Sequence, residues 1–179
     1  PTPTIGMVGR IADIHNKMTL GFKSEGDAIY IIGKQVSDLA SSEYLANLKK
    51  IEKMPAPYFN LEEEFQMQQT VTSLIQSNIL ESCHDLADGG LWTALCESSF
   101  VNQFGFEIVS NKEIRKDAFL FGEAQGRVLV SSKDEKALES ICNQMQVPFA
   151  KIGMVKADAA IIDQEDFGRI HDLKELYDN

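Results

Sequence analysis

Apolar runs with the character of strands alternate with amphipathic segments along this sequence, and the pattern of alternation limits the folds it can adopt. The clearest run, Ala28–Ile32, is rich in β-branched residues and bounded by Gly26 and Gly33, as expected of a buried strand. Further strands are predicted over residues 104–109, 128–131, 150–155 and 159–162. Because several of these strands follow one another without a helix between them, the sequence predicts an α+β fold, a layered α/β/α domain with a mixed sheet.

The strongest helix signal begins at Asn60. Asn60 is a favoured N-cap residue, Glu63 follows at the capping-box position, and apolar residues recur on one face of the next turns. This face comprises Leu61, Phe65, Val71, Leu74 and Ile75. We expect the helix to cover the sheet. Shorter helices are predicted over residues 41–50, 91–101 and 135–145, a short helix or turn over 114–121, and a final turn at 173–177.

Residues 1–11 predict an extended lead-in. The Pro-Thr-Pro-Thr stretch at 1–4 favours β or polyproline geometry and is typical of an interdomain linker. Residues 5–11 mix apolar side chains with Gly6 and Gly9, as an edge strand or first strand would. Since the chain starts at Pro1 without an initiator methionine or a signal peptide, we expect residues 1–179 to be a single domain that is part of a larger enzyme.

Charge and cysteine content exclude several classes of protein. The net charge of -10 at pH 7 argues against a nucleic-acid partner, because such binding uses clustered lysine and arginine. No apolar run approaches the length of a membrane span. Cys83, Cys96 and Cys142 include no Cys-x-x-Cys pair, which fits neither a disulfide framework nor a zinc site. We therefore expect a cytoplasmic protein with no nucleic-acid and no membrane partner.

The segment Cys83–Leu91 concentrates the polar chemistry of the chain. It is expected to be an acidic, histidine-bearing loop between two helices, the second of which opens with Gly89 and Gly90. Bare backbone N–H groups at the positive end of a helix dipole favour an anion such as phosphate. More often, the same pattern belongs to a simple turn. In such a turn the glycines supply positive φ angles and Asp88 is the N-cap residue of the helix.

Side chains suited to acid–base or metal chemistry are few. His84, Asp85 and Asp88 have the donor atoms for acid, base or Mg²⁺-ligand roles, since Mg²⁺ takes carboxylate oxygens and water. No nucleophile and base are evident from the spacing, so we predict no catalytic residue and expect Cys83 to be a small buried hydrophobe. Glu123 lies in a glycine-punctuated loop, where it is either a ligand-binding carboxylate or, more commonly, an exposed loop residue.

Five segments resemble the C-terminal synthetase half of the phosphoribosylformylglycinamidine synthases, the amidotransferases of the fourth step of purine biosynthesis. They agree with that family in order and spacing: PTPTIGMVGRI at 1–11, GDAIYIIG at 26–33, SSEYL at 41–45, CHDLADGGL at 83–91 and LFGEAQGRVLVS at 120–131. The PTP-x-IG lead-in and the GEAQGR loop favour this family within a wider group that includes aminoimidazole ribonucleotide (AIR) synthetase and selenophosphate synthetase.

The resemblance implies a fold of the AIR-synthetase C-terminal-domain type and an ATP-dependent ligase activity. The whole enzyme would convert formylglycinamide ribonucleotide and glutamine-derived ammonia into formylglycinamidine ribonucleotide. ATP and Mg²⁺ would be bound mainly by a separate N-terminal-type domain. The implied partners are N-terminal-type synthetase domains of the same enzyme, a glutaminase domain or subunit, and the small-molecule ribonucleotide substrate. The isolated domain is expected to be inactive.

The resemblance also implies a site for substrate or nucleotide. The predicted site residues are Ser42, Glu43, His84, Asp85, Asp88, Gly89, Gly90 and Glu123. The glycine pair is expected to bind phosphate through backbone N–H groups. His84 and Asp85 would orient the nucleotide or substrate. Ser42 and Glu43 would contact the substrate or a neighbouring domain.

Two positions depart from the family pattern. The segment 40–43, Ala-Ser-Ser-Glu, stands where the family commonly has Gly-Gly-Ser-Glu, and Ala87 stands where it has a serine, so a hydroxyl group is absent there. Whether this site is active or structural stays open. Two alternative functions also stay open: another member of the AIR-synthetase superfamily, and a non-catalytic domain that only scaffolds an assembly.

Overall fold

A seven-stranded sheet runs through residues 6–179, the part of the chain that this computed structural model describes. The strands are β1 (Ala28–Ile32), β2 (Ser82–Asp85), β3 (Gly105–Ile108), β4 (Val128–Ser132), β5 (Phe149–Lys156), β6 (Ala159–Ile162) and β7 (Glu165–Arg169). Their order across the sheet is β2-β4-β1-β5-β3-β6-β7. Neighbouring strands are antiparallel except for the parallel pair β3 and β6, so the predicted mixed sheet is confirmed.

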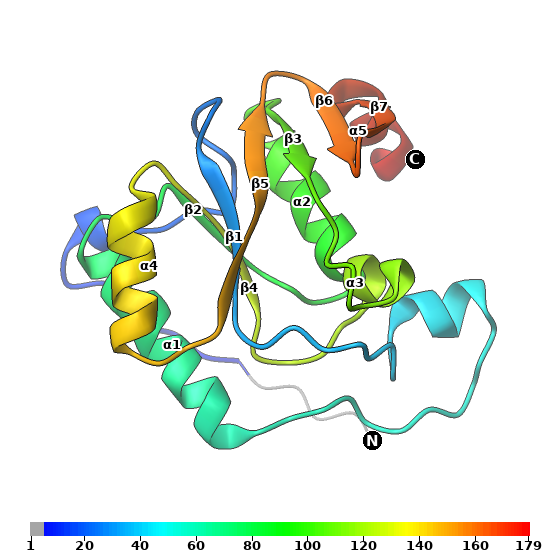
Figure 1. Cartoon of the computed structure of the whole chain (residues 1–179), viewed down its shortest axis with the longest axis horizontal. Coiled ribbons are helices and arrows are strands. Elements are labelled where there is room, and N and C mark those ends of the chain that lie inside the picture. The colour runs from blue at the N-terminus through cyan, green and yellow to red at the C-terminus, as the bar shows by residue number, and fades with distance from the viewer. Residues whose placement is uncertain (1–5) are drawn as a thin grey trace.

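Helices lie on both faces of this sheet. They are α1 (Leu61–Gln76), α2 (Gly90–Phe100), α3 (Lys116–Phe121), α4 (Glu135–Gln144) and α5 (Ile170–Asp178), with a 3₁₀ turn η1 (Ile14–Asn16) and a π-helical turn η2 (Tyr44–Leu48). Helices α1 and α4 cover one face, and α2 and α3 cover the other (Figure 1). None of the helices within residues 6–179 is long and apolar enough to cross a membrane.

The central strand β1 explains the layering. All of its residues are buried, and its side chains alternate between two cores. Ile29 and Ile31 pack in the core that includes residues of α2 and α3, whereas Tyr30 packs in the core that includes residues of α1 and α4. A strand that is apolar on both faces is buried only when helices cover both, so the layered α/β/α fold follows from this run.

Helices α1 and α4 begin where the sequence predicts. The Asn60 side chain accepts hydrogen bonds from the N–H groups of Glu62 and Glu63, at 3.0 and 3.1 Å. Asp134 accepts a hydrogen bond from the N–H of Ala137, at 3.0 Å. These side chains satisfy backbone donors that have no partner inside the helix. Both helix starts are therefore confirmed.

Only part of the apolar face predicted for α1 packs on the sheet. Leu74 is fully buried and Val71 packs against the same core, but Leu61 and Phe65 are 67% and 62% exposed. The prediction is wrong for these two because the first turns of α1 lie at the lower end of the sheet and extend beyond it (Figure 1). Met67 is the most N-terminal helix residue that is buried.

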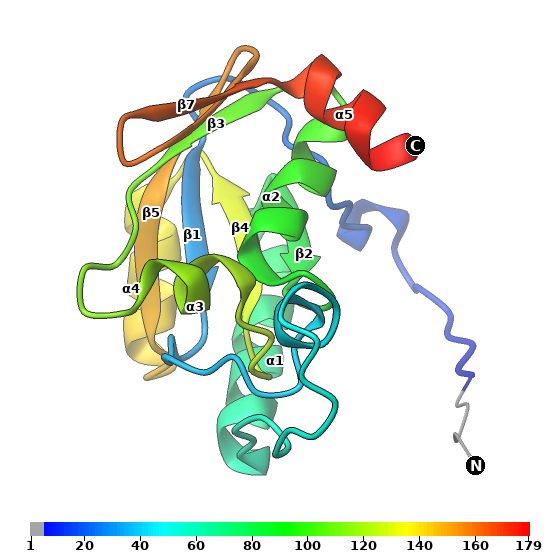
Figure 2. The same cartoon turned by 90° about the vertical axis from the view of Figure 1, so that its right-hand side faces the viewer.

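The strand predicted at residues 5–11 is not formed by residues 6–11. Met7 and Val8 are exposed over nearly their whole surface, at 91% and 103%. Figure 2 shows this segment running away from the sheet, so none of the described strands pairs with it. Apolar residues alone do not make a strand when no neighbouring strand binds their backbone. Ile5 and the predicted linker at 1–4 lie outside the described residues.

The first three residues of the segment Cys83–Leu91 belong to a strand and not to a loop. Strand β2 pairs with β4 at the edge of the sheet, with His84 opposite Leu129 and Asp85 opposite Val128. The loop prediction is wrong here because a short edge strand need not be apolar. The outer edge of this strand meets the segment before β1, where the Cys83 N–H donates to the carbonyl oxygen of Thr19 at 3.1 Å.

The C-terminal part of the chain differs from the prediction in its pairing. Strands β5 and β6 do not pair with each other: β5 lies between β1 and β3, and β6 lies between β3 and β7. The sequence does not predict β7, because this edge strand is polar and carries no apolar alternation. Helix α5 is a full helix and not a single turn, and Ile170 at its start is buried.

Candidate functional site

The Glu123 carboxylate joins three segments that are distant in the sequence. Its Oε1 accepts hydrogen bonds from the backbone N–H of Glu43, at 2.8 Å, and from the backbone N–H of Gly89, at 2.9 Å. Glu123 follows α3, Gly89 precedes α2, and Glu43 precedes η2. The structure therefore brings together residues from three of the predicted site motifs.

The start of α2 depends on the glycine pair. Gly89 and Gly90 have positive φ angles of 81° and 64°, which glycine adopts at little cost. A Cβ at Gly90 would lie 2.7 Å from the carbonyl oxygen of Gly122, so the loop after α3 passes directly over this helix start. Gly89 is the N-cap residue, and the expectation that Asp88 caps the helix is wrong. Asp88 itself is exposed.

Both glycine N–H groups expected to bind phosphate have acceptors within the chain. Gly89 donates to Glu123, and Gly90 donates to the carbonyl oxygen of Ala87 at 2.9 Å. A carboxylate at this position is favourable because it lies at the positive end of the α2 dipole. An external phosphate that binds the Gly89 N–H would have to replace the Glu123 carboxylate.

Ser42 lies beside this carboxylate but is turned toward its own segment. Its side chain is buried, its Oγ donates to the carbonyl oxygen of Leu39 at 2.7 Å, and it accepts from the N–H of Leu45 at 3.3 Å. The neighbouring Tyr44 ring stacks on Phe121, with ring centres 5.1 Å apart. Ser42 thus shapes the turn that presents the Glu43 N–H.

Arg127 fixes the loop that carries Glu123, and sequence reasoning missed it. Its guanidinium is buried and donates through Nε to the carbonyl oxygen of Ala124, at 3.0 Å, and through Nη2 to that of Gly122, at 2.8 Å. Burial lowers the pKa of Arg127, and the nearby Asp38 carboxylate partly offsets this. The available signal was an arginine immediately before an apolar strand, where a charge needs buried partners.

His84 and Asp85 belong to a separate cluster. His84 Nε2 lies 2.6 Å from Glu97 Oε2, and His84 Nδ1 lies 3.1 Å from Asp85 Oδ1. Tyr177 donates to the other Glu97 oxygen at 2.6 Å, and this hydrogen bond raises the pKa of Tyr177. No hydrogen bond within the described chain joins this cluster to Glu123. Burial raises the pKa of Cys83 to about 11, so its thiol is protonated at neutral pH.

Residues 6–179 contain no group of three or more His, Cys, Asp or Glu side chains placed to hold a metal ion. Both nitrogens of His84 are paired with carboxylates, and Asp88 is exposed.

The comparison with protein families decides the family. Residues 24–164 match the model described as "AIR synthase related protein, C-terminal domain". The chain belongs to this family. The seven-stranded sheet with helices on both faces is the α+β fold that the sequence predicts for it.

Relatives of this family member are similar along nearly all of the chain. It is 33% identical to the phosphoribosylformylglycinamidine synthase subunit PurL of Alkaliphilus metalliredigens, over 97% of this chain and 25% of the relative. It is 38% identical to the same subunit of Petrotoga mobilis, over 98% of this chain and 24% of the relative. The chain thus spans about a quarter of the length of these relatives.

Solved structures share the fold at low sequence identity. T. maritima PurL complexed with FGAR superposes with a TM-score of 0.74 at 13% identity, over 88% of this chain and 29% of that chain. Thiamine-monophosphate kinase from Stenotrophomonas maltophilia superposes with a TM-score of 0.52 at 15% identity, over 83% of this chain and 53% of that chain. The layered architecture is therefore common to proteins with different names.

Proposed function

We propose that this chain is the C-terminal synthetase domain of a phosphoribosylformylglycinamidine synthase. The whole enzyme would use ATP to convert formylglycinamide ribonucleotide and glutamine-derived ammonia into formylglycinamidine ribonucleotide. The observation that carries this proposal is the similarity to PurL subunits over 97% of the chain.

The contribution of this domain would be to position groups at the edge of a composite site. Phosphoryl transfer depends on positioning and charge neutralisation more than on covalent help from the protein. The start of α2 supplies an electropositive helix end, and Glu123 holds the Glu43 segment against it. When a phosphate group binds, the Gly89 N–H would donate its hydrogen bond to a phosphate oxygen in place of the Glu123 carboxylate.

ATP and Mg²⁺ would be held mainly by N-terminal-type domains of the same enzyme. One solved neighbour is T. maritima PurL complexed with ATP, which supports nucleotide binding by proteins of this fold. A further neighbour, PurLQS from Thermotoga maritima, supports a glutaminase and other subunits as partners.

A non-catalytic scaffold is the second candidate function. It is favoured by one specific observation: the Gly89 and Gly90 N–H groups are both paired within the chain. In this case Glu123 would be a permanent structural link and no phosphate would replace it.

Reconstitution tests the proposal. The chain is combined with N-terminal-type synthetase domains from a PurL relative, and formylglycinamidine ribonucleotide is measured with ATP and ammonia as co-substrates. We expect product from the complex and none from the chain alone. Conversion of formylglycinamidine ribonucleotide into aminoimidazole ribonucleotide, or activity with selenide, would indicate another superfamily member. Assembly without any nucleotide binding would favour the scaffold.

A further inference from the structure

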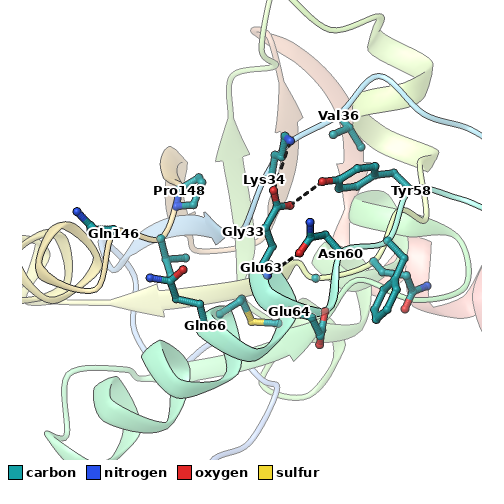
Figure 3. A pocket seen from close by; sticks show the side chains of 15 residues that line it. Gly33, Lys34, Val36, Tyr58, Asn60, Glu63, Glu64, Gln66, Gln146 and Pro148 are labelled. Carbon is teal, nitrogen blue, oxygen red and sulfur yellow. Dashed lines mark hydrogen bonds and ion pairs between the residues drawn. The ribbon is translucent and has the colours of Figure 1, made fainter.

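A cavity of about 340 Å³ lies at the N-terminal end of α1. Four segments line it: residues 33–36 after β1, residues 58–67 at the start of α1, Gln125–Gly126, and the turn 146–148 before β5. Figure 3 shows their side chains around the opening. Ligand pockets commonly have volumes of about 300–1,000 Å³, so this cavity has room for a small molecule of one or two rings.

Three charged side chains line the cavity, and two of them neutralise each other. Lys34 Nζ lies 3.6 Å from Glu63 Oε1 and 4.8 Å from the centre of the Tyr58 ring. Tyr58 donates its hydroxyl hydrogen to the other Glu63 oxygen, at 3.1 Å. Dashed lines in Figure 3 mark the ion pair of Lys34 with Glu63 and the hydrogen bond of Tyr58 to Glu63. The remaining charge of the lining is that of Glu64, so the cavity is net negative.

One of the two oxygens of the Glu64 carboxylate has no hydrogen-bond donor within the described residues. Its Oε1 accepts a hydrogen bond from Gln68 Nε2 at 2.7 Å. Its Oε2 is buried, and no donor within the described residues reaches it. This oxygen lies close to Gly126, where a Cβ would be 3.0 Å away. Glu64 and Gly126 both line the cavity, so this oxygen lies at its wall.

An unpaired buried carboxylate oxygen favours a ligand that brings an N–H donor. Leaving such an acceptor without a partner is costly, and a charge-assisted hydrogen bond removes that cost. The rest of the lining combines the amide side chains of Asn60, Gln66, Gln125 and Gln146 with apolar and aromatic walls formed by Phe59, Met67, Val147 and Pro148. Such walls favour a flat ring over an extended polar molecule.

We propose that this cavity binds a small flat ring that carries an N–H donor, either an ammonium group or a ring amino group. The donor is held by Glu64, and the ring packs between Phe59 and the turn at Val147 and Pro148. This inference uses none of the residues of the Glu123 site. A test of this inference is therefore independent of the test of the synthetase function.

Three probes of similar size test the ligand chemistry. Benzylamine, adenine and benzoate are titrated separately into the ¹⁵N-labelled chain, and amide shifts are followed by NMR. We expect benzylamine at millimolar concentration to shift the amides of Glu64, Gly126 and Val147, and benzoate to leave them unchanged. If adenine shifts the same amides as benzylamine, a neutral N–H donor is sufficient for binding. If adenine leaves them unchanged, binding requires a positive charge. Both results support the proposal.

A matched pair of variants tests the role of Glu64. Glu64→Gln keeps the shape of the side chain and should weaken benzylamine binding by about tenfold. Glu62→Gln removes the same charge from an exposed neighbour on the same helix and should leave the affinity unchanged. The proposal is overturned if benzoate shifts the same amides as strongly as benzylamine, or if neither N–H donor shifts them. Equal affinities of the two variants would also overturn it. The wild-type titrations decide the matter even if Glu64→Gln does not fold.

Discussion

The carboxylate of Glu123 accepts a hydrogen bond from the backbone N–H of Gly89, across 2.9 Å, at the start of α2. The same oxygen also accepts from the Glu43 N–H. An intramolecular anion therefore lies where the sequence predicts that an external one would bind. This arrangement couples the helix start, the loop after α3 and the segment before η2.

Removal of the Glu123 carboxylate should destabilise the fold. Glu123→Ala leaves two backbone donors without their acceptor and removes a negative charge from the helix N-terminus, so we expect a loss of about 1–3 kcal/mol in the free energy of unfolding. Glu123→Gln should lose less, because its amide oxygen still accepts. Urea denaturation measures both, with the exposed Glu113→Ala as control. Equal stability of Glu123→Ala and the control would show that the link contributes nothing.

Substitution of Gly90 should lower the free energy of unfolding for two reasons that can be separated experimentally. An alanine would adopt an unfavourable positive φ and would place its Cβ 2.7 Å from the carbonyl oxygen of Gly122. We expect Gly90→Ala to lower the free energy of unfolding by about 2–5 kcal/mol. Gly168→Ala has a positive φ but no neighbour within 4 Å, so it should lose only about 1–2 kcal/mol. If thermal denaturation gives the two variants the same loss, the close approach at Gly90 carries no cost.

Asp163 should make the stability of the domain sensitive to acid. Burial acts to raise its pKa, but hydrogen bonds from Ser110, Lys112 and Lys116 outweigh this and hold the pKa well below its usual range. A carboxyl group with a lowered folded-state pKa stabilises the fold above the unfolded value of about 4 and loses this effect as the pH falls toward the folded value.

The variant Asp163→Asn tests this. Asparagine tolerates the positive φ of 53° at this position, so the backbone is kept. We expect a loss of about 1–3 kcal/mol at neutral pH that shrinks below about pH 4, measured by urea denaturation across the pH range. The exposed Asp172→Asn should show no such trend. A difference from wild type that is constant down to about pH 2 would contradict the assignment.

The three cysteines should react slowly while the domain is folded. Burial raises the pKa values of Cys83 and Cys142 to about 11 and that of Cys96 to about 12, each with a smaller contribution from a nearby carboxylate. Because the thiolate is the reactive form, alkylation by iodoacetamide near neutral pH should be slow in buffer and fast in urea. Mass spectrometry counts the modified thiols. Rapid modification of Cys83 in the native state would contradict the raised pKa of its thiol.

Much of the fold follows from local sequence. The run Ala28–Ile32 predicts the central strand because burial on both faces leaves an uninterrupted apolar pattern, and Asn60 and Asp134 predict helix starts because capping is a contact between near neighbours. Strand β7 escapes prediction because an exposed edge needs no apolar pattern. Residues 6–11 have an apolar composition without a strand to pair with.

The candidate site is less predictable for a related reason. The sequence singles out Gly89, Gly90 and Glu123 individually, since turns and glycine-rich loops have recognisable compositions. It does not reveal that Glu123 binds the Gly89 and Glu43 N–H groups, because these partners are 34 and 80 residues away. Arg127 is missed since its acceptors are carbonyl oxygens, and every residue has one.

Arg127 should control the site through the loop that carries Glu123. Arg127→Lys keeps the charge, but a single ammonium group does not reproduce the two hydrogen bonds that the fork of the guanidinium makes to Gly122 and Ala124. A buried charge with incomplete partners is costly, so we expect a loss of about 2–4 kcal/mol in the free energy of unfolding. The exposed Arg115→Lys should change it by less than about 0.5 kcal/mol.

Amide hydrogen exchange distinguishes a local effect of Arg127→Lys from a global one. If Arg127 positions the loop, the N–H groups of Gly89 and Glu43 should exchange much faster in the variant, because both depend on Glu123. Amides of β1, such as that of Tyr30, should accelerate only by the factor that the measured loss of global stability requires. Uniform acceleration of all amides would mean that Arg127 contributes to stability in general and does not position Glu123.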